Sequence, residues 1–194
     1  MLPFLRKPAA EIKAKKRYGI IISGPWDYKP NRDYLDYAIE KVFPKIKINT
    51  NVLIMGINPG ETLRKKIRSY QKEDSAISIE ILENVKNYRE MVASSEIYFL
   101  SIKSGAGSSS KTLDAMEAGI PALVSHFIKE GMDPHGECPG LIACRDENEY
   151  AGWINILLAN KELCKKNWRC GNDILPEKAK RSSSGLFKNT EMVQ

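Results

Sequence analysis

Short apolar runs alternate with amphipathic segments along most of the chain, and this alternation predicts its secondary structure. Runs of consecutive β-branched and other apolar residues are typical of strands that are buried on both faces of a parallel sheet. Segments with apolar residues at helical spacing separate these runs. The predicted strands are residues 18–23, 52–55, 77–82, 97–102, 120–124 and 141–143, and the predicted helices are residues 33–43, 61–70, 88–93, 111–118, 147–158 and 161–170.

The order of these elements predicts the fold class. Strands that alternate with helices form right-handed crossovers, which make the strands parallel and cover both faces of the sheet with helices. We therefore predict an α/β fold with a Rossmann-like parallel sheet, formed by residues 18–174. Residues 1–17 lack apolar periodicity and are predicted to form a basic arm or linker, and the polar residues 175–194 a flexible tail.

The distribution of charge limits the classes of partner. The 194 residues carry a formal net charge of +6, of which residues 1–19 account for +5 and residues 175–194 for +2, so residues 20–174 carry −1. A nucleic-acid-binding domain carries its basic surface on the folded part, so we expect no nucleic acid partner. The basic ends are either solvated flexible segments or weak contacts to an acidic membrane surface.

The sequence contains no candidate membrane span, signal peptide or metal site. Its longest stretch without a charged residue has 11 residues, whereas a spanning helix needs about 20 apolar residues. We therefore expect a soluble, cytoplasmic protein with at most peripheral membrane contact. The four cysteines follow one another at intervals of 6, 20 and 6 residues, unlike the close pairs of zinc sites. We interpret them as small, partly buried side chains in a reducing cytosol and expect no metal.

Two loops that follow predicted strands are the candidate binding segments. Ligands of an open parallel sheet bind beyond the carboxyl ends of its strands. Residues 24–33, GPWDYKPNRD, follow the first predicted strand, and residues 104–111, SGAGSSSK, directly precede a predicted helix.

The second of these loops has the composition of an anion site. Its glycines, among them Gly107, let the backbone approach a ligand closely, and Lys111 adds a positive charge. Asp114, one helical turn later, is able to accept hydrogen bonds from sugar hydroxyls. Three serines offer amide and hydroxyl donors next to the lysine: Ser108, Ser109 and Ser110. The combination favours phosphate, although a Ser/Gly loop before a helix also serves as a simple cap and connection.

The sequence around this loop resembles the donor-binding segment of family-four retaining glycosyltransferases. In that family a Gly-x-Gly loop and a lysine precede Leu-Glu-Ala-Met-Ala-x-Gly-x-Pro-Val-Val, to which residues 103–125, KSGAGSSSKTLDAMEAGIPALVS, are similar. Three further segments follow the family in the same order, so that the resemblance covers residues 18–172: GPWDYKPNRDYLDYAIEKVFPKI, ILENVKNYREMVASSEIYFL and DENEYAGWINILLANKELCKKN.

The resemblance implies one half of a B-type two-domain glycosyltransferase, namely the C-terminal domain that binds the nucleotide-sugar donor. The donor would be linked to UDP, GDP or ADP. Its glycosyl group would be transferred with retention, as by a hexosyltransferase, only together with a separate acceptor-binding domain or protein. No cofactor is implied. The alternative is a non-catalytic, truncated remnant that acts as an interaction or structural protein.

The family motifs also imply roles for single residues. Lys111 would be the catalytic group that stabilises the leaving diphosphate, together with the amides of the three serines. Asp114 would replace the glutamate that binds the ribose hydroxyls, and Gly24 would let the backbone approach the phosphates. Asn84 and Val85 would lie near the base.

The chain departs from the family pattern at several of these positions. Glu83 stands where the base-binding turn has a glycine, and Ala106 stands where the family has a second carboxylate. Pro25 replaces an arginine that often follows the first strand, a loss for which Lys29 or Arg32 would have to compensate.

Overall fold

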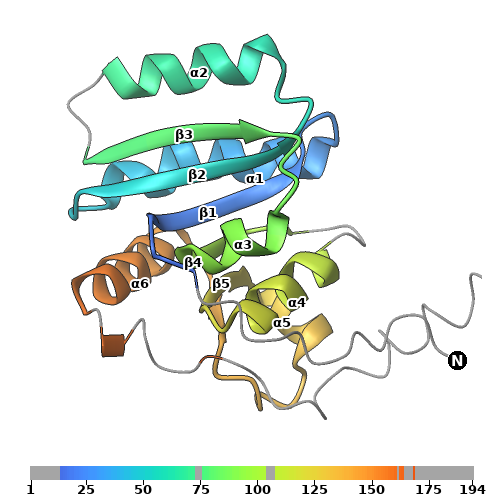
Figure 1. Cartoon of the computed structure of the whole chain (residues 1–194). Helices are drawn as coiled ribbons and strands as arrows, with labels where there is room; N and C mark the ends of the chain where they lie inside the picture. Colours follow the sequence, from blue (N-terminus) through green and yellow to red (C-terminus); the bar gives the residue numbers. More distant parts are fainter. Residues whose placement is uncertain (1–13, 73–75, 104–107, 161, 164–167, 169–194) are drawn as a thin grey trace, which may run out of the picture.

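The computed structural model describes residues 14–72, 76–103, 108–160, 162–163 and 168, and strands and helices alternate along them (Figure 1). The strands are β1 (Tyr18–Pro25), β2 (Thr50–Ile57), β3 (Ile77–Glu83), β4 (Ser95–Leu100), β5 (Ala122–Ser125) and β6 (Leu141–Cys144). The α-helices are α1 (Lys29–Tyr37), α2 (Gly60–Lys72), α3 (Tyr88–Ala93), α4 (Ser108–Ala118), α5 (His126–Met132) and α6 (Glu147–Ala159).

The strands form one sheet in the order β3-β2-β1-β4-β5-β6, and every pair of neighbours is parallel. From β1 the chain builds outward through β2 to β3, returns to the centre, and builds outward again from β4 to β6. The direction of building therefore reverses between β1 and β4. The predicted fold class, a Rossmann-like parallel sheet, is confirmed.

Helices cover both faces of this sheet, as predicted. On one face α3, α4 and α5 pack next to one another, and Figure 1 shows them in front of the strands. On the other face, Lys66 of α2 pairs with Asp36 of α1 (Nζ–Oδ1 2.6 Å), and α6 packs against residues 38–42, which continue α1. The chain between β1 and β2 thus leaves the sheet on the face opposite to α4.

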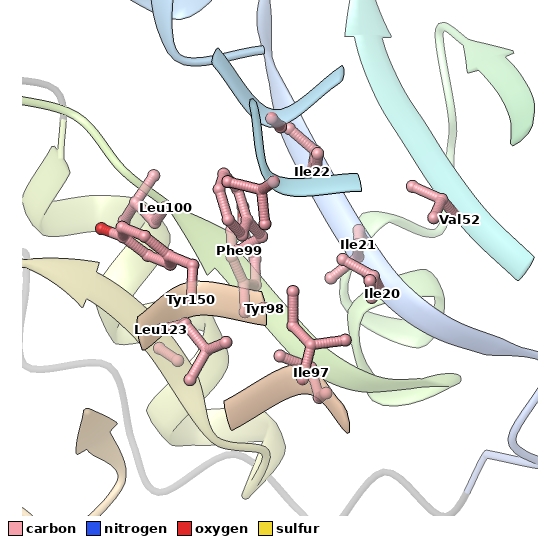
Figure 2. Close-up of a cluster of buried hydrophobic side chains, with 14 of the residues drawn as sticks. Ile20, Ile21, Ile22, Val52, Ile97, Tyr98, Phe99, Leu100, Leu123 and Tyr150 are labelled. Carbon is pink, nitrogen blue, oxygen red and sulfur yellow. The ribbon is translucent and has the colours of Figure 1, made fainter. Parts of the chain in front are cut away.

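The core lies at the two central strands, because these strands are covered on both faces. Residues 20–22 of β1 and 97–100 of β4 have no exposed surface. Figure 2 shows these side chains packed together with Tyr150 of α6. The ring centroids of Tyr150 and Phe99 lie 4.9 Å apart, so that α6 is held against β4.

Among the helices, α1 and α5 differ most from the sequence prediction. α1 begins at Lys29, four residues before the predicted start, because Pro30 occupies the first turn, where proline needs no hydrogen-bond partner. It continues as a π-helical turn, Ala38–Val42, and a 3₁₀ turn, Phe43–Lys45. α5 was not among the predicted helices; Ser125 starts this short helix by accepting a hydrogen bond from the N–H of Ile128.

The ends of the predicted domain lie largely outside the described residues. These undescribed parts are residues 1–13 of the arm, the tail 175–194 and most of the predicted helix 161–170. The backbone N–H of Arg17, at the end of the arm, donates to the carbonyl of Ser94 (2.8 Å). The domain boundaries stay predictions. Within the described part of the chain, no helix combines the length and the apolar character needed to cross a membrane.

Two cysteines lie among the described residues, and one is in a disulfide while the other is a free thiol. Cys138 is disulfide-bonded, so the interpretation of this residue as a reduced side chain is wrong. Cys144 is a buried free thiol, and burial raises its pKa to about 12. A thiol with so high a pKa is a weak nucleophile.

Candidate functional site

The carboxyl ends of β1 and β4 meet where the order of the strands reverses. In an open parallel sheet, this switch point is where ligands bind. β4 ends at Leu100, two residues earlier than predicted, so residues 101–103 belong to the loop before α4. Because β1 and β4 are neighbours in the sheet, the two candidate loops begin at the same edge.

The three serines of the candidate anion site form the first turn of α4. The helix begins at Ser108, three residues before its predicted start, so Ser109 and Ser110 are helical as well. The first amides of an α-helix have no partner within the helix, and the helix dipole makes this end positive. The serine backbone therefore lies where an anion site requires donors. Gly107 lies outside the described residues.

Lys111, at the fourth position of α4, is buried, with 9% of its surface exposed. Burial lowers the pKa of Lys111, and the nearby carboxylate of Asp114 partly offsets this effect. No hydrogen bond or ion pair joins Lys111 to another of the described residues. Burying an ammonium without hydrogen-bond partners costs free energy. An anion bound here would therefore meet a cation that the protein has only partly neutralised.

Asp114 lies one turn after Lys111 on the same side of α4 and is half-buried. The hydroxyl of Tyr88, the first residue of α3, lies beside its carboxylate. Burial raises the pKa of Tyr88 to about 12, and the charge of Asp114 and a hydrogen bond to it add to the rise. Arg89, the next residue of α3, pairs with Glu117 of α4 (3.3 Å). These two contacts hold α3 against the side of α4 that carries Asp114.

A cluster of hydroxyl groups, formed by Ser23, Tyr34, Tyr88 and Tyr98, lies at the carboxyl ends of β1 and β4. Tyr88 Oη lies 3.0 Å from Ser23 Oγ and 3.0 Å from Tyr98 Oη. Ser23 Oγ and Tyr98 Oη also share a hydrogen bond, and Tyr34 Oη donates to the Ser23 carbonyl (2.5 Å). Ile21 is the register partner of Tyr98, so Ser23, two residues on, directs its side chain to the same face. This hydroxyl cluster joins β1, β4, α1 and α3.

Gly24 is required by packing inside the protein. Gly24 and Gly56 are partners in the register of β1 and β2. A Cβ on Gly56 would lie 1.8 Å from the Gly24 carbonyl oxygen, and a Cβ on Gly24 would lie 2.7 Å from Asn31 Nδ2. Asn31 is buried and donates from this nitrogen to the Pro25 carbonyl (2.8 Å). Packing thus explains why position 24 is a glycine, which the sequence alone did not. That Gly24 lets the backbone approach the phosphates stays a prediction.

Asn84 forms the turn at the end of β3. Its φ of 50° is left-handed, a conformation that asparagine adopts more readily than most residues. Its N–H donates to the Gly56 carbonyl (3.2 Å). The turn for which a glycine was expected is therefore made one residue after Glu83, and Glu83 pairs instead with Arg64 of α2. Asn84 is exposed and Val85 packs partly on the core, and their contact with a base stays a prediction.

The two basic residues considered as replacements for the missing arginine contact the β1–α1 segment. Arg32 Nη1 donates to the carbonyls of Trp26 (3.0 Å) and Asp27 (2.5 Å). Lys29 pairs with Asp33 (2.6 Å) at the surface of α1. Arg32 thus fixes the loop after β1, and Lys29 forms a solvent-exposed pair, which contributes little to stability.

Two of the cavities in the described part of the molecule are lined by neither Lys111 nor Asp114. One of about 350 Å³ lies at the carboxyl ends of β5 and β6, where Lys103, His126 and Arg145 contribute to its wall. The other, of about 620 Å³, lies at the opposite edge, at the amino ends of the first four strands. The candidate site is therefore assigned from its chemistry and its place at the switch point, and neither of these two cavities coincides with it.

The described residues bring together a buried ammonium, the start of a helix and a carboxylate one turn later. Gly24 is the residue before the last of β1, and Asn84 and Val85 follow β3 at the same edge, two strands from β1. Among the described residues, no group of three or more His, Cys, Asp or Glu side chains is arranged to hold a metal ion. This arrangement is able to bind a phosphorylated ligand that also carries hydroxyl groups.

Comparison with known families finds one match. The protein-family model described as "Glycosyl transferases group 1" matches residues 17–160, which is most of the chain. No curated protein sequence matches it.

Solved structures share the fold at low sequence identity. The pneumococcal O-GlcNAc transferase GtfA, solved with UDP and GlcNAc, matches with a TM-score of 0.60 and 16% identity, over 92% of this chain and 38% of GtfA. TarM from S. aureus matches with a TM-score of 0.59 and 15% identity, over 80% of this chain and 32% of TarM. The C-terminal domain of LpcC, a glycosyl transferase group 1 family protein from Francisella tularensis, matches with a TM-score of 0.53 and 18% identity, over 83% of this chain and 85% of that domain. The chain thus spans well under half the length of GtfA and TarM.

Proposed function

The chain belongs to the glycosyl transferases group 1 family, and on this premise we propose that it is the donor-binding domain of a family-four, B-type glycosyltransferase. In this role it binds a nucleotide-diphosphate sugar, linked to UDP, GDP or ADP, at the switch point between β1 and β4. The observation that carries the proposal is the buried ammonium of Lys111, which shares one side of α4 with Asp114 and has no hydrogen-bond partner among the described residues.

Each part of the donor then has a counterpart in the chain. The ammonium of Lys111 and the first amides of α4 hold the diphosphate. They also stabilise the charge that develops on it when the glycosyl bond breaks, which is the electrostatic part of catalysis. The carboxylate of Asp114 accepts hydrogen bonds from the ribose hydroxyls. Asn84 and Val85 contact the base, and Gly24 lets the backbone approach the phosphates.

We infer further that this domain corresponds to the C-terminal half of such an enzyme. In support, the chain matches 85% of the LpcC C-terminal domain but 38% of GtfA. Transfer with retention then requires a separate acceptor-binding domain or protein, which supplies the other wall of the cleft. GtfA was solved with UDP and GlcNAc, which favours a UDP-linked donor among the three candidates.

Calorimetric titration of the full chain with UDP, GDP and ADP tests the donor role. We expect at least one of them to bind with a dissociation constant on the order of 1 mM, which corresponds to about 4 kcal/mol. Inorganic pyrophosphate should compete for the site, and the matching nucleoside without phosphates should bind more weakly. If none of the three diphosphates binds at millimolar concentration, the donor role is refuted and the non-catalytic remnant is favoured.

A further inference from the structure

Tyr88 occupies a position between the two parts of the proposed nucleotide site. It is the first residue of α3 and directly follows residues 84–87, which include the proposed base contacts. Figure 1 shows α3 beside α4, below β1 in this view. The Tyr88 hydroxyl lies beside the carboxylate of Asp114 in α4 and bonds to groups of β1 and β4. The Tyr88 side chain therefore connects residues 84–87, which we call the base loop, with the Asp114 carboxylate that is proposed to bind the ribose.

The partners of the Tyr88 hydroxyl in the sheet are themselves fixed. Ser23 is 2% exposed and Tyr98 is fully buried, and their hydroxyl groups lie 3.0 Å from Tyr88 Oη. Tyr34 holds the backbone of Ser23 through the carbonyl. A phenol has one proton to donate and accepts through its oxygen. Ser23 is therefore able to donate to Tyr98 and Tyr98 to Tyr88, while Tyr88 donates to Asp114.

The aspartate makes such a support necessary. Asp114 replaces a longer glutamate of the family pattern, and its half-buried carboxylate must hold one orientation to meet a pair of ribose hydroxyls. A hydrogen bond from a side chain that is itself locked by packing supplies that orientation. The Tyr88 hydroxyl thus links the loop of residues 84–87, the central strands and α4.

We propose that Tyr88 is a positioning residue of the nucleotide site: its hydroxyl, anchored by Ser23 and Tyr98, orients the Asp114 carboxylate toward the ribose and fixes the base loop relative to it. This inference rests on the proposed function, because it presupposes that Asp114 binds a ribose. Tyr88 touches no phosphate in this scheme, so its effect is confined to ligands that carry the ribose hydroxyls.

The test compares the Tyr88→Phe variant of the full chain with the wild-type chain by calorimetry. The probes are the best-binding diphosphate of UDP, GDP and ADP, its 2′,3′-dideoxy analogue and inorganic pyrophosphate. We expect Tyr88→Phe to weaken binding of the ribose-containing diphosphate by about 2- to 10-fold, the effect of one hydrogen bond. The dideoxy analogue and pyrophosphate should bind both chains equally.

Two further variants serve as controls. Tyr98→Phe removes a neighbouring buried hydroxyl but leaves the contact between Tyr88 and Asp114, so it should affect nucleotide binding less than Tyr88→Phe. In an Asp114→Asn background, Tyr88→Phe should have no additional effect on nucleotide binding, because residues that act through one another are not additive.

The possible failures of the two proposals are distinguishable. If the wild-type chain binds none of the three diphosphates, the proposed function fails and this inference fails with it. If the wild-type chain binds one of them and Tyr88→Phe binds it equally well, the inference alone is overturned. An equal loss of pyrophosphate and nucleotide binding also overturns it, because Tyr88 would then maintain the fold of the whole site.

Discussion

Replacing Lys111 with methionine should stabilise the free protein and weaken diphosphate binding. Lys111 is 9% exposed, and its burial lowers the pKa of its side chain, which means that the folded environment disfavours the charged form. Methionine has a similar length and no charge, so it fills the same space without this cost. Replacing a buried ion pair with apolar side chains of similar volume is often neutral or stabilises the protein by roughly 1–4 kcal/mol. Asp114 partly offsets the cost here, so we expect about 1 kcal/mol, the lower end of that range.

The pH dependence of stability should also show that the charged form of Lys111 destabilises the folded chain. Because the pKa of Lys111 in the folded chain lies below its ordinary value of 10.5, the unfolded chain binds more protons between the two values. The stability of the wild-type protein therefore increases as the pH rises through that window. Lys111→Met should lack this increase. Affinity for a diphosphate should change in the opposite direction, because the neutral amine that forms on raising the pH attracts an anion less.

Urea unfolding at neutral and alkaline pH, with calorimetric titration of the best-binding diphosphate, measures both effects. We expect the substitution to weaken binding by about 1–2 kcal/mol, the contribution of a charge-assisted hydrogen bond. Lys65→Met is the matched control, since it removes the same charge from an exposed position of α2, away from the site. Our reasoning is refuted if Lys111→Met unfolds at a lower urea concentration than the wild type. Unchanged diphosphate affinity would remove Lys111 from the site.

Two stability predictions concern other parts of the fold. Asp133→Asn should destabilise the protein by about 3 kcal/mol in urea unfolding, because the Asp133 carboxylate, 1% exposed, pairs with Lys129 Nζ at 2.6 Å. Burial raises the pKa of the Asp133 carboxyl, but hydrogen bonds from Lys129 and two backbone N–H groups outweigh it and hold this pKa below its ordinary value of 3.8. The stability that the ionised carboxylate contributes is therefore present above pH 3.8 and lost as the pH falls through the lowered pKa. An Asp133→Asn variant whose stability falls as steeply in acid as that of the wild type would contradict this prediction. Gly56→Ala should lower stability by about 1–3 kcal/mol, because its Cβ would lie 1.8 Å from the Gly24 carbonyl oxygen. Gly152→Ala, in α6 with no atom within 4 Å of the new Cβ, should raise stability by about 0.5–1 kcal/mol, and melting curves in which both variants shift alike would refute the packing argument.

Elements whose local pattern is unambiguous could be predicted from the sequence. The consecutive isoleucines of residues 20–22 indicated a strand buried on both faces, and these residues have no exposed surface. The bounds of α3 match the prediction. α1 was placed four residues late, because its first turn is polar and contains Pro30, so the apolar periodicity begins only inside the helix. α5 has seven residues and contains Gly131, which leaves too short a pattern to distinguish a helix from a loop.

The candidate site was only partly accessible in the same way. The spacing of Lys111 and Asp114 placed both on one side of a helix, because residues three apart are neighbours there. The burial of Lys111 could not be predicted, since lysines are mostly exposed and its burial depends on tertiary packing. The hydroxyl cluster gave no signal in the sequence, because Ser23 and Tyr98 are 75 residues apart and meet only through the pairing of β1 and β4.

The buried ammonium also distinguishes a binding domain from a remnant kept only for its fold. A fold that serves as a scaffold gains nothing from Lys111, because we expect an apolar side chain at this position to stabilise it. A domain that binds a diphosphate uses the same desolvated charge, since electrostatic attraction to an anion is stronger where water is excluded. A destabilising group that lies at the switch point, next to the first turn of α4, is therefore expected in the binding domain and not in the scaffold. If Lys111→Met changes neither stability nor diphosphate affinity, position 111 does not distinguish a binding domain from a non-catalytic remnant, and the remnant is again a full alternative.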